Sequence, residues 1–158
     1  MLFLFLLAIF FNITNSSKYT DEFIFDVELT CNLRNRAFWT FSVQFFDRDS
    51  FLNPDDSVGP EIHHAHRPGT AKFRITGSQT EDEFFNYNYE IYAKIFHDCT
   101  ESHQSVQLII NITPLCQHYR DCHYKLQANL ENSWGIVGRR IFLNMTDDND
   151  YRKYVHCI

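Results

Sequence analysis

The sequence lacks the excess of basic residues with which proteins neutralise nucleic-acid phosphates. Asp and Glu outnumber Lys and Arg by 20 to 14, and the formal net charge at pH 7 is -6. This balance argues against nucleic acid as a partner, and against unaided electrostatic binding to anionic lipid. The chain also lacks a nucleophile elbow, a P-loop and a zinc-protease helix motif, so we predict no catalytic residue and no cofactor.

Long hydrophobic runs are absent beyond the N-terminus. Residues 1–11 form an uninterrupted apolar run, and small and polar residues follow over 12–17. The run is too short to span a bilayer, and its pattern is typical of a signal peptide. We therefore predict a signal peptide over residues 1–17, a single domain over residues 18–158, no transmembrane segment, and secretion of the mature chain.

Aromatic residues are abundant, with 16 Phe and 8 Tyr, and such side chains suit a pleated sheet better than a helix. Apolar and polar residues alternate from Phe25 to Cys31 and from Trp39 to Phe45, which is the period of a strand with one buried face. The predicted strands cover residues 25–31, 39–45, 72–76, 87–96, 106–112, 122–126 and 136–143, with an acidic loop over 47–59 and a helical turn over 81–85. About seven short strands predict an all-β sandwich of two layers.

Five cysteines follow the predicted leader: Cys31, Cys99, Cys116, Cys122 and Cys157. In a secreted chain we expect them to be oxidised, and their odd number leaves one thiol either free or paired with another molecule. Spacing alone does not assign the bridges. The triplets that begin at Asn111 and Asn144 are acceptors for N-linked glycosylation, and Pro114 makes the first of them the poorer acceptor.

A set of motifs follows in a recognisable order over about residues 25–100. They are LTCN at 29–32, VQFFDRD at 43–49, NPDD at 53–56, GTAKFRITGS at 69–78, Glu81, and IFHDC at 95–99. With this ordered set the chain resembles the nematode transthyretin-like family of secreted proteins. The resemblance implies a transthyretin-like sandwich of two antiparallel sheets, located in the extracellular region or at the cell surface, without known catalysis.

The cysteines depart from the pattern of that family. Its members usually carry a cysteine shortly after the segment that ends at Cys99, whereas residues 102–105 here are Ser-His-Gln-Ser. Cys116 and Cys122 look like local replacements. Within this resemblance we expect Cys31 to pair with Cys157, and Cys99 to pair with either Cys116 or Cys122.

Two clusters of side chains could bind a metal ion. His64 and His66 would share one face of a strand, because alternate residues do, whereas His63 would point the other way. Four carboxylates could supply oxygen ligands to calcium, those of Asp47, Asp49, Asp55 and Asp56. We interpret the histidines as a solvated loop, the acids as a solvated turn and His97 as a structural residue, and we predict no metal site.

Hydrolysis is the alternative function, because the enzyme 5-hydroxyisourate hydrolase has the transthyretin fold. That enzyme ends in Tyr-Arg-Gly-Ser, whereas Tyr151 and Arg152 are followed here by Lys153 and Tyr154. We therefore expect a non-enzymatic extracellular binding protein that contacts an unidentified protein, lipid headgroup or small apolar ligand through its loops. A metal-dependent or 5-hydroxyisourate-hydrolase-like enzyme is the alternative. The oligomeric state stays open, with association through a sheet edge as one route.

Overall fold

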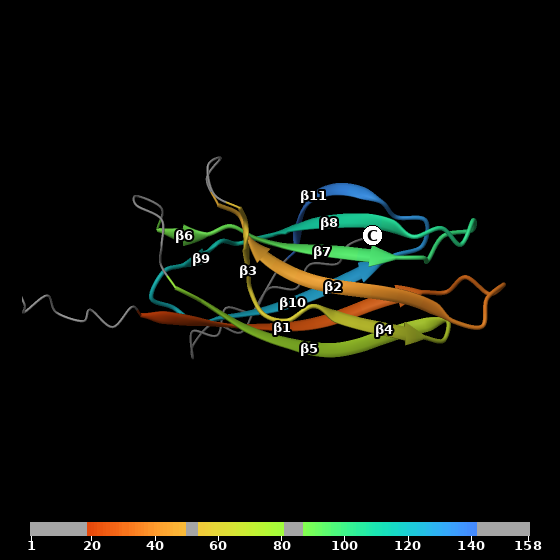
Figure 1. Ribbon diagram of the computed structural model, residues 1–158, viewed down its shortest axis with the longest axis horizontal. Coiled ribbons are helices and arrows are strands. Elements are labelled where there is room, and N and C mark those ends of the chain that lie inside the picture. The colour runs from red at the N-terminus through yellow and green to blue at the C-terminus, as the bar shows by residue number, and fades with distance from the viewer. Residues whose placement is uncertain (1–18, 50–53, 81–86, 142–158) are drawn as a thin grey trace, which may run out of the picture.

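The computed structural model describes residues 19–49, 54–80 and 87–141, and all regular structure in these ranges is β (Figure 1). The strands are β1 (Thr20–Cys31), β2 (Trp39–Asp47), β3 (Asp56–Ser57), β4 (Ile62–His66), β5 (Gly69–Thr80), β6 (Asn88–Tyr89), β7 (Ile91–His97), β8 (Val106–Ile112), β9 (Cys116–Gln117), β10 (Cys122–Asn129) and β11 (Gly135–Ile141). Each of the seven predicted strands overlaps at least one of these, and the one over 87–96 covers β6 and most of β7. The predicted leader and helical turn lie outside the described residues.

The strands form two layers. A three-stranded sheet has the order β10-β1-β5, and a larger sheet has the order β11-β8-β7-β2-β3, with β4 also paired to β2. A short ribbon of β6 and β9 lies at one end (Figure 1). The predicted all-β sandwich is therefore confirmed. None of the described segments is a helix with the length and hydrophobicity needed to cross a membrane.

The core lies between the two sheets and follows directly from the alternation in β1. Phe23, Phe25, Val27 and Leu29 are each at most 2% exposed, and the residues between them are less buried. Phe25 stacks on Phe45 of β2 with 3.7 Å between the ring centroids, so one aromatic contact joins the sheets. The period of two in the sequence thus places one face of each strand in a shared aromatic core.

Two strand pairs are parallel, which corrects the expectation of purely antiparallel sheets. β1 pairs with β10 in a parallel register from Phe23–Cys122 to Thr30–Asn129, and β11 pairs with β8 in parallel as well. The chain crosses from the larger sheet to the three-stranded sheet after β8 and returns after β10. Each crossing joins strands in different sheets, so the next strand is free to run in the same direction as its new neighbour.

Candidate functional site

The disulfides differ from both expected pairings. Cys31 is bonded to Cys99, and Cys116 is bonded to Cys122. β1 and β7 belong to opposite sheets and end at the same edge of the sandwich, so Cys31 and Cys99 meet across the core with 6.0 Å between their Cα atoms. Because these four cysteines are paired with one another, the expected bonds from Cys31 to Cys157 and from Cys99 to Cys116 or Cys122 are wrong. Cys157 itself lies outside the described residues.

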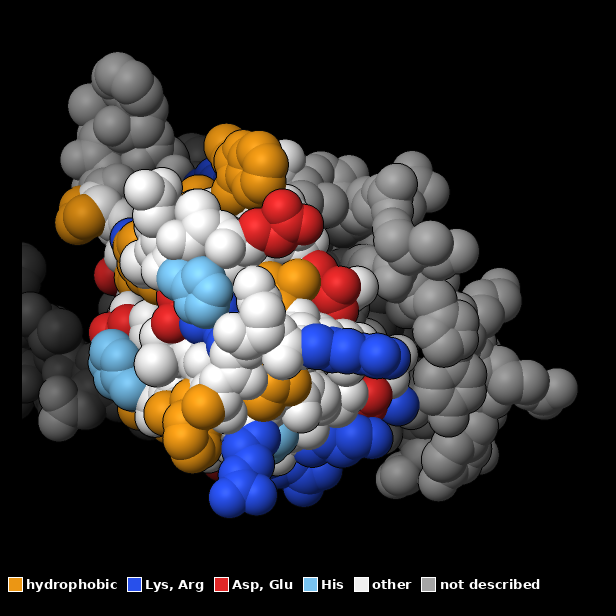
Figure 2. Space-filling model, turned by 90° about the vertical axis from the view of Figure 1, so that its right-hand side faces the viewer, with side chains coloured by type: hydrophobic (Ala, Val, Ile, Leu, Met, Phe, Trp, Pro, Cys, Tyr) orange, Lys and Arg blue, Asp and Glu red, His pale blue; other side chains and the backbone are white. Residues whose placement is uncertain are grey.

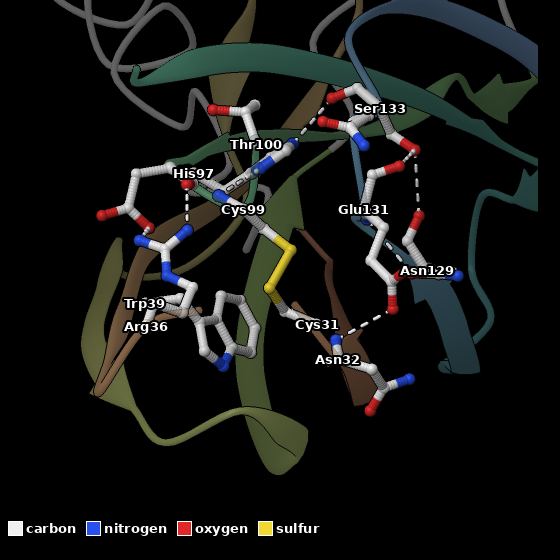
Figure 3. Close-up of a disulfide and its surroundings, with 12 residues drawn as sticks. Cys31, Asn32, Arg36, Trp39, His97, Cys99, Thr100, Asn129, Glu131 and Ser133 are labelled. Atoms are coloured by element: carbon white, nitrogen blue, oxygen red, sulfur yellow. Dashed lines mark hydrogen bonds and ion pairs between the residues drawn. A yellow bond between two sulfur atoms is a disulfide. The ribbon is translucent and has the colours of Figure 1, made fainter. Parts of the chain in front are cut away.

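The longer disulfide lies within a network that ties together the loops at one end of the sandwich (Figure 3). The Arg36 side chain is only 4% exposed, and it forms an ion pair with Asp98 at 2.9 Å between Nη2 and Oδ1. The same carboxylate oxygen accepts a hydrogen bond from the backbone N–H of Thr40. Across the disulfide, Glu131 accepts a hydrogen bond from the backbone N–H of Asn32 at 2.9 Å. The turns after β1, β7 and β10 are thereby held to one another.

His97 is part of this end of the molecule and has a structural role. Its side chain is buried, Nδ1 accepts a hydrogen bond from the backbone N–H of Cys99, and Nε2 lies 2.8 Å from the carbonyl oxygen of Ser133. A ring that accepts at Nδ1 and donates at Nε2 is neutral. Burial lowers the pKa of His97, against the raising effect of the Ser133 carbonyl. The ring therefore links β7 to the turn before β11.

The described residues at the loop end form no continuous apolar surface. Phe38 and Trp134 are 55% and 67% exposed, and both lie in turns at this end. In Figure 2, which looks at this end of the molecule, hydrophobic side chains form separate patches among charged, histidine and other polar side chains. The loops, which we expected to make the contacts, therefore present scattered aromatic groups rather than one site.

The histidines expected in a solvated loop form strand β4 instead, which pairs with β2 from Trp39–His66 to Val43–Ile62. His64 lies 5.6 Å from both Phe41 and Phe73 between ring centroids, and Nδ1 of His66 lies 2.6 Å from the carbonyl oxygen of Arg67. Both rings are thus engaged at the edge of the sandwich. Across the described ranges, no group of three or more His, Cys, Asp or Glu side chains is placed to hold a metal ion.

The carboxylates of the acidic segment are used in hydrogen bonds that tie the segment to neighbouring strands. Asp47 accepts from the backbone N–H of Glu90 at 2.6 Å, and Asp55 accepts from the hydroxyl of Tyr92 at 2.7 Å. Asp56, which lies in β3, accepts from the side-chain amide of Gln79. Burial, helped by the bond to Asp55, raises the pKa of Tyr92 to about 12. These acids therefore position the end of β2 rather than converge on one point.

The outer face of the three-stranded sheet carries two clusters of paired charges. Arg74 donates two hydrogen bonds to Asp26, at 2.7 Å to Oδ1 and 3.0 Å to Oδ2, and Nε2 of His123 lies 2.6 Å from the same Oδ2. Glu28 forms an ion pair with Lys72 at 3.1 Å. Arg74 and His123 lower the pKa of Asp26, as Lys72 does that of Glu28. On this face each of these charges has a partner of opposite sign.

The outer face of the larger sheet has a different chemistry. Nζ of Lys94 lies over the rings of Phe46 and Phe96, at 5.5 and 5.6 Å from their centroids. Phe46 stacks on Tyr92 with centroids 5.4 Å apart, and the guanidinium of Arg48 lies over Tyr92. We call these five residues the aromatic platform. Among the described carboxylates none forms an ion pair with Lys94, which contrasts with the neutralised opposite face.

A hollow of about 410 Å³ lies next to the platform, on the same face. Thr40 and Ser42 form its floor, because they alternate with the core residues of β2 and therefore point outward. His63 of β4 and Phe96 of β7 are the cross-strand partners of Ser42 on either side, so they form the two walls. The remaining lining comes from Phe41, His64, Ala65, His97 and Ser105.

The alternation of β7 contained a signal for this site that the sequence reasoning missed. The prediction from the sequence considered only the inward face of the strand, which includes Ile91 and Ile95. The intervening positions are Tyr92, Lys94 and Phe96. A strand whose outward face carries two aromatic residues is the pattern that could have indicated aromatic groups on this face, where Phe96 is 39% exposed and Tyr92 is 9% exposed.

One of the two predicted glycosylation acceptors lies on this face. Asn111 is the cross-strand partner of Tyr92 in β8, and its Oδ1 accepts a hydrogen bond from Arg48 at 2.9 Å. The Thr113–Pro114 peptide bond that follows is cis. Asn144 lies outside the described residues, and the use of either acceptor stays a prediction.

Comparison with known proteins identifies no family for the chain. No family model matches it, and no curated protein matches it. Among solved structures, an alternative pilotin from the type II secretion system of Vibrio cholerae has 12% sequence identity and a TM-score of 0.31, with 61% of this chain and 100% of the pilotin chain covered. A likeness of that size carries no argument about fold or function. The resemblance to the transthyretin-like family therefore stays a prediction.

Proposed function

We propose that this chain is a secreted, non-enzymatic binding protein that contacts an extracellular or cell-surface partner through the outer face of its larger sheet. The observation that carries the proposal is the contrast between the two outer faces. On the three-stranded sheet Arg74 is paired with Asp26 and Lys72 with Glu28, whereas the larger sheet presents the aromatic platform around Lys94 and the hollow beside it. Clustered aromatic side chains beside a cation without an acidic partner are typical of binding surfaces.

Two further features support an extracellular role. The apolar run over residues 1–11 has the pattern of a secretory leader. Both disulfides are of the kind that persists in oxidising compartments. A sandwich whose loops are held by the longer disulfide and by the Arg36–Asp98 ion pair also suits binding, because little conformational entropy has to be lost on contact.

The binding proposal is tested by measuring attachment of fluorescently labelled, oxidised protein to intact cells. We expect saturable binding in the micromolar range or tighter, and a loss of about tenfold or more in affinity for the double variant Lys94→Gln/Phe96→Ala. The matched control is Lys72→Gln/Phe38→Ala, which removes one cation and one exposed aromatic ring elsewhere on the surface. Absence of saturable binding, or equal losses in both variants, would contradict the proposal.

Export is tested separately in a eukaryotic secretion system. We expect the protein in the medium without residues 1–17, and with Cys31–Cys99 and Cys116–Cys122 found in the peptide map. Recovery of the protein from the cytosol with reduced thiols would refute the extracellular assignment.

A further inference from the structure

We infer that the hollow and Lys94 together bind one ring of an acidic saccharide, a sugar chain that carries sulfate or carboxylate groups. This inference rests on the proposed function and names the chemistry of its ligand. Three properties of the site lead to it: the spacing of the two walls, the hydroxyl groups of the floor, and the charge of Lys94.

The spacing of the walls fits a single six-membered ring. His63 and Phe96 flank Ser42 on opposite sides, one strand away in each direction. Neighbouring strands are about 4.8 Å apart, so the two walls stand on strands separated by about 9.6 Å. One ring between the walls needs about 3.5 to 4 Å on each side, or about 7 to 8 Å in all, whereas two stacked rings need at least about 10.5 Å. The slot therefore admits one ring, on edge, with Ser42 beneath it.

The floor and walls together fit a sugar better than a purely apolar ring. The hydroxyl groups of Thr40 and Ser42 can each donate and accept a hydrogen bond, which is what a ligand rich in hydroxyl groups needs at its edge. Phe96 is 39% exposed and offers an apolar ring face to the C–H groups of a pyranose. An apolar ligand would instead cover these hydroxyls without satisfying them, at a cost in free energy.

Charge on this face favours an anionic ligand and orients it. Lys94 lies on the Phe96 side of the hollow, with no ion pair to a described acid. On the opposite wall, Glu61 lies 3.4 Å from His63. The positive group therefore stands beside one wall and the negative group beside the other. A sulfate or carboxylate is attracted toward Lys94 and repelled from Glu61, so the acidic substituent points along β7.

Isothermal titration calorimetry with defined hexasaccharides tests the inference. The probes are a heparin hexasaccharide, a hyaluronan hexasaccharide, which has carboxylates only, and uncharged maltohexaose. We expect the two acidic probes to bind and maltohexaose to bind at least about tenfold more weakly, as expected if a charge-assisted hydrogen bond to Lys94 is lost. Which acidic probe binds more tightly tells sulfate from carboxylate as the preferred group.

Matched variants separate a specific site from general charge. Lys94→Gln and Lys72→Gln change the net charge equally, but only the first removes the cation beside the hollow. We expect about a tenfold loss for Lys94→Gln, a similar loss for Ser42→Val, whose side chain lacks the hydroxyl, and no change for Lys72→Gln. Equal effects of the two lysine variants, or no binding of either acidic probe to a folded protein, would overturn the inference.

The outcome is distinguishable from failure of the proposed function. Cell binding that depends on Lys94 and Phe96, yet is unchanged by excess heparin and hyaluronan hexasaccharides, supports a binding protein and refutes the saccharide. Loss of cell binding in the presence of one acidic hexasaccharide, but not of maltohexaose, supports both. Absence of cell binding together with tight hexasaccharide binding supports the saccharide site and contradicts only the cell-surface assignment.

Discussion

Removal of the longer disulfide should destabilise the fold far more than removal of the shorter one. Cys31 and Cys99 are separated by 68 residues, whereas Cys116 and Cys122 are separated by 6. On the chain-entropy model, closing these loops stabilises the folded state by about 4.4 and about 2.2 kcal/mol respectively. The predicted difference is therefore about 2 kcal/mol, with the longer bridge more important.

The comparison is between the double variants Cys31→Ala/Cys99→Ala and Cys116→Ala/Cys122→Ala, each with Cys157→Ser to prevent thiol exchange. All four bonded cysteines are at most 1% exposed, so both double variants lose a similar amount of buried packing. The difference between them then reports mainly on the loops. Urea unfolding followed by tryptophan fluorescence gives the free energy of unfolding and its dependence on denaturant.

Two results would refute this reasoning. Equal losses in the two double variants would mean that loop length does not decide the contribution of each bridge. A larger loss for the Cys116→Ala/Cys122→Ala variant would mean that the shorter bridge acts by fixing the folded turn rather than by restricting the unfolded chain. The slope of the unfolding transition should rise in the variant that lacks Cys31–Cys99, because its unfolded state is less restricted and exposes more surface.

Three further predictions concern single residues. Burial lowers the pKa of His97 in the folded state, so the unfolded chain binds a proton at this histidine at a higher pH than the folded chain does, and stability falls as the pH drops below about 6.5. In melting curves from about pH 8 to 5, His97→Gln should remove this part of the acid destabilisation. A gain in the stability of the wild type as the pH is lowered over this range would contradict the prediction. Arg74 lowers the pKa of Asp26, so the ionised carboxylate contributes to the free energy of unfolding above about pH 4, and this contribution is lost below it. Because the ion pair is exposed, Asp26→Asn should lower the free energy of unfolding in urea by under about 1 kcal/mol at pH 7 and by almost nothing at pH 2. Gly77→Ala should destabilise the fold by about 1–3 kcal/mol in thermal melts, because the added Cβ would lie 2.7 Å from the backbone of Val58. An unchanged melting temperature would contradict this prediction and show that the backbone moves to relieve the contact.

Alternation in the sequence was enough to predict the main strands. The predicted bounds of β8 match the observed ones, and β1 and β5 were predicted as strands that are shorter than the observed ones. The short prediction for β5 has a physical cause, since Gly77, Ser78 and Gln79 carry little strand preference by themselves. They are strand because the long register with β1, from Thr20–Thr80 to Cys31–Gly69, holds them there.

What could not be predicted depends on contacts between distant segments. β4 consists of Ile-His-His-Ala-His, which lacks the β-branched and aromatic pattern of a strand and pairs only because β2 offers an open edge. The parallel direction of β10 and β11 leaves no trace in a period of two. Cysteine spacing does not predict the disulfide pairing either, because the bond from Cys31 to Cys99 requires that β1 and β7, which lie in different sheets, end close together.

The aromatic platform and the hollow were beyond sequence reasoning for a similar reason. Phe46 and Phe96 lie 50 positions apart in the numbering, and only the register of β2 against β7 brings them to either side of Lys94. One wall of the hollow depends on the unpredicted strand β4, which supplies His63. Sequence pattern can tell inward positions from outward ones, but cross-strand register decides which outward side chains meet.

The parallel pairing of β1 with β10 sets an order of events during synthesis. The paired residues are 99 positions apart in the chain. β10, the second neighbour of β1, is therefore synthesised roughly 5 to 20 s after β1. β5 and Cys99 are made well before β10 and can cover one edge of β1 and close the longer bridge in the meantime. The other edge of β1 stays open to chaperones and to neighbouring chains until residues 122–129 arrive, because its backbone N–H and C=O groups have no strand partner before then.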